Sequence, residues 1–167
     1  ESPSPVSALL SGALLNCAFL GIFKTYAILH ASGMDQWAGS LLVGFGLFSM
    51  LVASVFMMIQ EDYKRLFAYS SIENMGIIAV GTGIGGLAGL GAMVHLVHHS
   101  LLKAALFLST GNILFGYGTR QIRRVGGMAG LLPMTFIGFT CGFAGISGFP
   151  PFGLFVSELM ILFGAFQ

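Results

Sequence analysis

Long apolar stretches alternate with short polar segments along this chain, and most of the apolar stretches are of similar length. A helix of about 20 apolar residues is long enough to cross the hydrocarbon core of a bilayer. The pattern therefore predicts an all-α, polytopic membrane helix bundle with about five transmembrane spans, at residues 6–29, 37–59, 66–82, 90–117 and 130–166. The glycine-rich segment GTGIGGLAGLG predicts a flexible turn between the third and fourth spans.

Local signals add detail to the first two spans. Ser4 is placed to cap the first helix, with Pro5 at its first position, where the missing N–H of proline has no cost. Gly39, Gly44 and Gly46 in the second span remove side-chain bulk and predict close contact with a neighbouring helix.

The fifth span is too long for a simple crossing and contains the segment GFPPFG. Two prolines flanked by glycines remove N–H donors and favour non-helical backbone. Such a break at membrane depth is tolerated inside protein or beside a water-filled cavity, and transporters use broken helices at their ion sites. Glu158 follows the break and is the one charged residue of 125–167, so it is either an ion-path carboxylate or a buried, hydrogen-bonded group at a kink.

Composition agrees with this membrane assignment. Hydrophobic residues make up 56% of the chain and charged residues only 8%, against about a quarter charged in soluble domains. A net charge of +1 gives no reason to expect nucleic acid as a partner. The partner expected from composition is the lipid bilayer itself.

Basic residues are distributed unevenly between the two sides of the predicted bundle. Lys64 and Arg65 precede the third span and Arg120–Arg124 follow the fourth, so alternating spans put both loops on one side. The positive-inside rule makes that side, and the N-terminus, cytoplasmic. Lys24, near the far end of the first span, is expected to extend towards the opposite interface, with a secondary role in ion transfer as an alternative.

The candidate chemistry lies in the stretch MVHLVHHSLLKAALFLSTGN, where His95, His99 and Lys103 are four residues apart. This spacing stacks the three side chains along one face of a helix. Ionisable groups inside a membrane are costly unless they face partners or water, and they commonly mark proton relays. We therefore expect the three residues to belong to a proton path. His98 is one position off this face and is expected to be a packing or secondary relay group.

Two further polar residues interrupt apolar spans. Glu73 is the sole charge between residues 66 and 94, and it is either a proton-relay carboxylate or a protonated carboxyl bonded to a neighbouring helix. Asn16, near the middle of the first span, is expected to form an interhelical hydrogen bond, with a secondary role in transport as an alternative. No cofactor is expected in this chain, because it has no ligand set for an iron–sulfur cluster or for nickel.

Four strings in the sequence resemble a known family: PSPVSALLSGALL, DYKRLFAYSSIENMG, HLVHHSLLKAALFLSTGNI and GFPPFGLFVSELMILFG. Together they are similar to the antiporter-like membrane subunits of respiratory complex I, multisubunit cation/proton antiporters and group 4 nickel–iron hydrogenases. The forms YSSIENMG, STGNI and GFPPFGLFVSE most resemble the membrane subunits of hydrogenase-4 and formate hydrogenlyase. The resemblance covers nearly the whole chain.

The resemblance implies a fold of about fourteen helices that contains two inverted five-helix repeats, each with one broken helix. Residues 1–167 would form a single membrane domain, with 6–29 as the last helix of the first repeat and 37–166 as most of the second. By this match, His95, His99 and Lys103 fall on the histidine and central-lysine positions of the second half-channel, and Glu158 falls on the outlet position. Asn16 stands where several relatives have a connecting lysine, which argues against direct lysine coupling between half-channels.

The first-repeat glutamate and lysine of the family are absent, so we expect either a piece of a longer subunit or a short homologue that needs partner subunits. The expected function is proton or sodium translocation in the plasma (inner) membrane of a prokaryote. It would be coupled to a hydrogenase or NADH dehydrogenase-like oxidoreductase whose iron–sulfur and nickel–iron centres lie in other membrane and peripheral subunits. The alternatives are a non-transporting scaffold for a peripheral oxidoreductase, and a cation/proton antiporter subunit.

Overall fold

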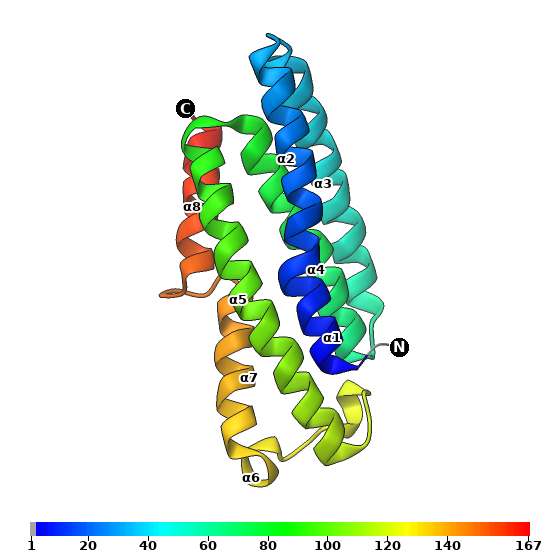
Figure 1. The fold of residues 1–167 in the computed structure, drawn as a ribbon. Helices are drawn as coiled ribbons and strands as arrows, with labels where there is room; N and C mark the ends of the chain where they lie inside the picture. The colour runs from blue at the N-terminus through cyan, green and yellow to red at the C-terminus, as the bar shows by residue number, and fades with distance from the viewer. Residues whose placement is uncertain (1–2) are drawn as a thin grey trace.

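The computed structural model describes residues 3–167 and forms an elongated bundle of helices (Figure 1). Its helices are α1 (Ser4–Leu9), α2 (Leu15–Ala31), α3 (Asp35–Ile59), α4 (Tyr63–Ile84), α5 (Gly86–Tyr117), α6 (Met128–Leu131), α7 (Pro133–Ile146) and α8 (Gly153–Ala165). A π-helical turn, Leu10–Leu14, joins α1 to α2, and a short 3₁₀ turn, Ile122–Arg124, precedes α6. The predicted all-α polytopic membrane fold is confirmed.

Three continuous helical segments are each long and apolar enough to cross a membrane within the described part of the chain: Ser4–Ala31, Asp35–Ile59 and Gly86–Tyr117. The 22 residues of α4 are also long enough, but polar side chains interrupt its apolar sequence. Two shorter apolar helices, α7 and α8, lie end to end and together make the fifth segment. The predicted break in the last span is therefore present, at residues 147–152.

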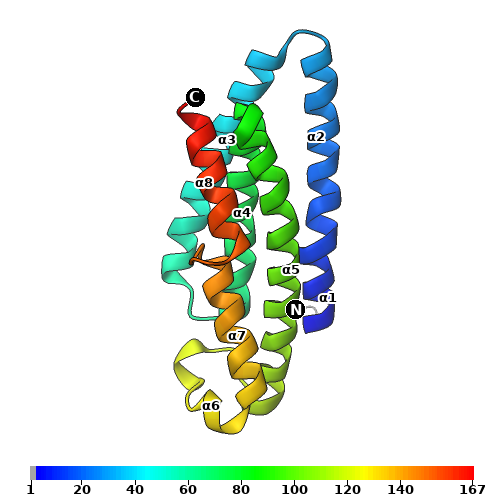
Figure 2. The same cartoon turned by 90° about the vertical axis from the view of Figure 1, so that its left-hand side faces the viewer.

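The central helix of the bundle is α5. In two views turned by 90°, α7 and α8 follow one side of α5 and α1–α2 follow the other, while α4 packs against α5 as well (Figure 2). Two apolar clusters fill these interfaces, one around Ile78, Ala88, Ala92 and Ile161, the other around Phe67, Leu106 and Phe107. Any side chain on the inner face of α5 is consequently shielded from lipid by several helices.

Two predictions about helix ends were wrong. The helix α1 begins at Ser4 itself, with Pro3 as the capping residue and no side-chain cap. The expected flexible turn between the third and fourth spans is helical almost throughout, because α4 continues to Ile84 and α5 begins at Gly86. Two consecutive glycines make the reversal, Gly85 with φ 78° and Gly86 with φ 52°, and glycine adopts positive φ more readily than other residues.

The prediction of close glycine contacts in α3 is confirmed at two of three positions. A Cβ built on Gly46 would stand 2.7 Å from the carbonyl oxygen of Gly76 on α4, and one on Gly39 would stand 2.5 Å from that of Gly83. A Cβ built on Gly44 would meet no atom within 4 Å, so this glycine faces outward. The backbones of α3 and α4 thus approach closely at two points, which fixes how α4 presents its other face to α5.

The two basic loops meet at one end of the bundle, as the alternation of spans predicts. The Tyr63 amide donates to the Arg120 carbonyl at 3.2 Å, and the Ile122 amide donates to the Glu61 carbonyl at 2.9 Å. Glu61 also pairs with Arg123 at 3.5 Å, and the Asp62 side chain caps α4. The N-terminal end of α1 lies towards the same end (Figure 1). One end of the bundle is therefore rich in basic residues.

Candidate functional site

His95, His99 and Lys103 all point into the bundle from α5, and each has a relative exposure of 0%. We call these three residues the buried row. Their four-residue spacing brings them onto one helix face, as the sequence predicts, and the packing of α4 and α8 against α5 makes that face internal. The most polar face of this helix is therefore also its most buried one.

His95 is held from both sides. Its Nε2 lies 3.0 Å from Oδ1 of Asn74 on α4, and its Nδ1 lies 3.0 Å from Oγ of Ser157 on α8. The imidazole thus bridges two helices that flank α5. Both ring nitrogens have a partner, which is the condition for burying such a ring at modest cost.

Lys103 is bound by α4 alone. Its Nζ donates to the Phe67 carbonyl at 2.6 Å and to the Ser70 hydroxyl, and it lies 5.6 Å from the centre of the Phe67 ring. These two acceptors and the aromatic face give the buried amine the contacts that a polar group needs inside an apolar bundle. Among residues 3–167, neutral groups fix the lysine and no carboxylate forms an ion pair with it.

Ser70 connects the two ends of the buried row through α4. Its hydroxyl accepts from Lys103, while its carbonyl accepts from the Asn74 amide at 2.7 Å. Asn74 in turn bonds His95. Polar groups therefore run without interruption from Ser157 on α8, through α5 and α4, to Lys103.

His99 lies between these anchored residues and is different from both. Neither of its ring nitrogens has a hydrogen-bond partner among the described residues, although the side chain is fully buried. A buried polar group left unbonded costs about 1–3 kcal/mol. Packing alone gives no reason to place an imidazole there, since an apolar side chain would fill the space without that cost.

Two carboxylates flank the buried row. Glu73 on α4 is partly buried, accepts a hydrogen bond from Ser54 on α3 at 3.3 Å, and is close enough to Lys103 for electrostatic interaction. Glu158 on α8 is partly buried, and a Cβ built on Gly148 would stand 2.5 Å from its Oε2. Its carboxylate therefore lies against the break between α7 and α8.

The remaining predicted residues take different positions. Asn16 donates to the Gly12 carbonyl at 2.9 Å and to the Ser100 hydroxyl on α5, so the expected interhelical bond is confirmed. Lys24 is exposed on α2, outside the buried row. The Nδ1 of His98 donates to the Val94 carbonyl at 2.9 Å, and its ring packs over Gly153 at the start of α8.

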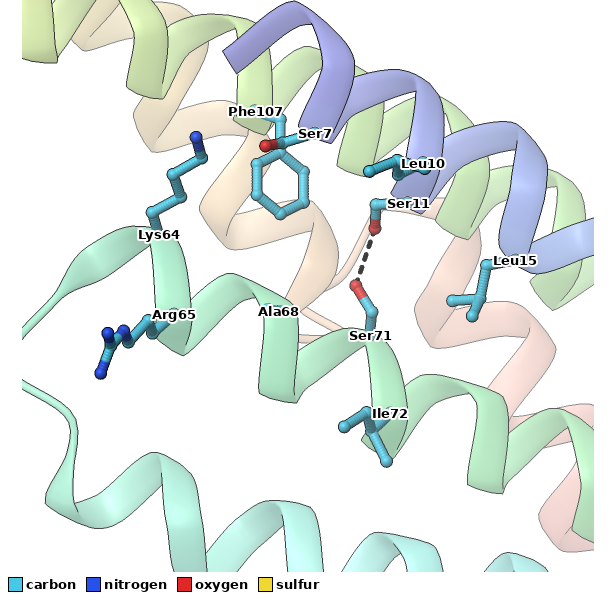
Figure 3. Close-up of a pocket in the computed structure, with 10 residues that line it drawn as sticks. All are labelled: Ser7, Leu10, Ser11, Leu15, Lys64, Arg65, Ala68, Ser71, Ile72 and Phe107. Carbon is cyan, nitrogen blue, oxygen red and sulfur yellow. Dashed lines mark hydrogen bonds between the residues drawn. The ribbon is translucent and has the colours of Figure 1, made fainter. Parts of the chain in front are cut away.

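A groove of about 360 Å³ opens between the α1–α2 segment and α4 (Figure 3). Ser11 and Ser71 point towards each other across it and are hydrogen-bonded at 2.8 Å, while Lys64 and Arg65 lie at one end. Ser71 also donates to the Phe67 carbonyl, the same acceptor that binds Lys103. The lining of the groove is mainly apolar. The groove therefore adjoins the buried row without being part of it.

Sequence reasoning missed Ser70, Asn74 and Ser157 as members of the site. A signal for the first two was present, because they are four residues apart in an apolar span and share one helix face. Ser157 had no comparable signal. Only the packing of α8 against α5 brings its hydroxyl to His95.

This arrangement, a broken helix beside a central helix with buried ionisable groups, is typical of antiporter-like membrane subunits. Residues 1–167 match the family described as "NADH:quinone oxidoreductase/Mrp antiporter, TM", and the chain belongs to this family.

Curated relatives align with nearly the whole chain. The chain is 42% identical over 167 residues to a hydrogenase-4 component F homolog of Methylacidiphilum infernorum, covering 99% of this chain and 35% of the relative. It is 35% identical over 170 residues to hydrogenase-4 component B of Escherichia coli, covering 94% of this chain and 25% of that protein. The chain thus spans about a third or less of the length of these relatives.

A solved structure has the same fold. It is that of the membrane-bound sulfane sulfur reductase, an archaeal respiratory membrane complex, which superposes with a TM-score of 0.87 at 25% identity. The match covers 98% of this chain and 34% of the other. The resemblance stated from the four sequence strings is confirmed: the chain is an integral membrane protein whose homologues are subunits of multisubunit membrane complexes.

Proposed function

We propose that this chain carries protons, or sodium ions, across the membrane as part of a hydrogenase-type or related respiratory oxidoreductase complex. The observation that carries the proposal is the buried row, in which two imidazoles and an amine are fully enclosed by apolar helices. Among ordinary side chains, imidazole titrates nearest neutral pH, so it exchanges protons at low cost. In this proposal the redox chemistry takes place in partner subunits, which hold the iron–sulfur and nickel–iron centres.

The path we propose runs along the buried row between the two carboxylates. Glu73 is near enough to Lys103 to change the energy of its charged form, and Glu158 lies at the helix break. A charge arriving at one group shifts the proton affinity of the next, which is how a redox event elsewhere can drive transfer. Asn16, Lys24 and His98 have at most secondary roles in it.

Orientation follows from the basic end of the bundle. We propose that the end with Lys64, Arg65 and Arg120–Arg124 faces the cytoplasm of a prokaryotic cell, with the N-terminal end of the chain on the same side. Glu158 is partly buried and lies in the half of α8 that is nearer the break. The membrane in question is the plasma, or inner, membrane.

The test uses the full-length subunit in its assembled complex, reconstituted in vesicles with a pH-sensitive dye and a sodium-sensitive dye. Lys103→Ala and Glu158→Gln should each abolish coupled ion movement while assembly stays intact. Glu61→Gln and Arg123→Ala, which remove the two charges of an exposed surface pair, serve as matched controls and should leave flux unchanged.

The two alternatives give other outcomes in the same experiment. If the chain is only a scaffold, Lys103→Ala and Glu158→Gln lower the amount of assembled complex and leave flux per complex unchanged. If it is an antiporter subunit, the flux persists without redox turnover and needs a counter-ion gradient. Unchanged flux in fully assembled complex with both substitutions would overturn the pathway.

A further inference from the structure

The contacts of His95 specify which of its nitrogens exchanges a proton. Asn74 Nδ2 donates to the Ser70 carbonyl at 2.7 Å, and a carbonyl only accepts. The amide of Asn74 is therefore oriented with its nitrogen towards Ser70 and its oxygen towards His95. Because an amide oxygen also only accepts, Nε2 of His95 carries a hydrogen in every protonation state.

The other nitrogen faces a group that can act in either sense. The Ser157 hydroxyl lies 3.0 Å from Nδ1 of His95 and 2.8 Å from the Leu154 carbonyl. It has one hydrogen and can turn it to either neighbour. When His95 is neutral, Ser157 donates to Nδ1; when His95 is charged, Nδ1–H donates to Ser157 and Ser157 donates to Leu154.

We propose that Ser157 and Asn74 are positioning residues that make His95 a two-state proton carrier, with Nδ1 as the exchanging nitrogen. This inference rests on the proposed ion-transfer function. In both states every polar hydrogen on the ring has an acceptor, so protonation leaves no buried group of this site unbonded. Only the Ser157 hydroxyl has to rotate between the two states, and the His95 ring keeps its position.

Proton transfer in this arrangement needs one further reactant, an acid such as hydronium that supplies the proton. The Ser157 oxygen gives its hydrogen to Nδ1 and takes a proton from hydronium. The serine O–H bond and one hydronium O–H bond break, an N–H bond and a new serine O–H bond form, and a water molecule leaves with the positive charge now on the His95 ring. The new O–H then points to Leu154. The exchange thus occurs on the side of α8, the second half of the broken helix.

His99, between two anchored residues, does not share this arrangement, because it has no partner among the described residues. The titratable neighbours of His95 are His98 and His99 on its own helix. On the helices packed against it, Glu73 stands next to Asn74 on α4 and Glu158 stands next to Ser157 on α8. Their charges bias the state of His95, while the two neutral partners let both states persist.

The first test is ion flux by the reconstituted complex as a function of pH, with Ser157→Ala in the full-length subunit. Removing the hydroxyl leaves charged Nδ1–H without an acceptor, which should slow flux about tenfold, equivalent to one lost hydrogen bond. The half-maximal pH should fall, because the charged state loses the stronger bond. Ser157→Cys, whose sulfur accepts weakly, should restore part of the rate.

Thr82→Val is the matched control. Thr82 is a buried hydroxyl on α4 that bonds the carbonyl of Ile78 in its own helix, so its loss should change neither flux nor its pH profile.

The second test is spectroscopic and does not depend on flux. In full-length protein with ¹⁵N-labelled histidine, the signal that disappears in His95→Gln should report a neutral ring protonated at Nε2. Asn74→Leu should abolish that preference. A ring protonated at Nδ1 in the wild-type protein would overturn the inference.

The two proposals fail in different ways. If His95→Gln and Lys103→Ala stop flux while Ser157→Ala keeps the wild-type rate and pH profile, the inference about Ser157 is wrong and the proposed function stands. If none of the three changes flux, the proposed function itself is wrong.

Discussion

Replacing Lys103 with methionine should separate stability from function. Methionine has nearly the length of the lysine side chain and no charge. In the native protein Nζ makes two hydrogen bonds, to the Phe67 carbonyl and the Ser70 hydroxyl. Bonds to a charged group contribute about 1.5–3 kcal/mol each. Burying the ammonium has an opposing cost of several kcal/mol, so the two terms nearly cancel.

The groups left behind keep other hydrogen bonds. The Phe67 carbonyl also accepts from Ser70 at 3.3 Å and from Ser71 at 3.1 Å. In Lys103→Met the Phe67 carbonyl therefore keeps two donors, and the Ser70 hydroxyl keeps the bond that it donates. We expect the free energy of unfolding to change by less than about 2 kcal/mol, while ion flux is lost.

The assay is denaturant-induced unfolding of the purified full-length subunit in detergent, set beside flux in vesicles. Ile78→Ala is the reference for a structural loss, because Ile78 is fully buried and apolar. It should cost about 2–5 kcal/mol. A loss for Lys103→Met as large as that for Ile78→Ala, with flux preserved, would refute the reasoning and make Lys103 a structural residue.

Two glycines give further predictions. Gly46→Ala should lower the free energy of unfolding by about 1–3 kcal/mol, because its Cβ would stand 2.7 Å from the facing carbonyl. Gly44→Ala, on the open face of the same helix, should be neutral or stabilising; equal losses in the two variants would contradict the packing of α3 against α4. Gly148→Ala should slow flux and cost about 1–2 kcal/mol, since φ is +65° and the new methyl would displace the Glu158 carboxylate. Gly138→Ala, in ordinary contact on α7, is its control, and normal flux with Gly148→Ala would show that the carboxylate position is unimportant.

Local sequence patterns were enough to predict the class of fold and the ionisable residues of the candidate site. Apolar blocks of bilayer length fix where helices form, because every backbone polar group in lipid must be bonded within its segment. The four-residue spacing of His95, His99 and Lys103 fixes their common face by helix geometry alone. The GFPPFG segment determined the break, since proline removes donors that a helix needs.

The hydrogen-bond partners of these residues depend on which helices pack together. Ser157 and Asn74 reach His95 because α8 and α4 pack against α5 from different sides, and no local pattern encodes that meeting. Gly46 and Gly44 are two residues apart in the same helix, yet Gly46 contacts α4 and Gly44 faces outward. Local sequence sets the conformation of each helix, whereas the partner of each side chain is set by contacts between residues far apart in the chain.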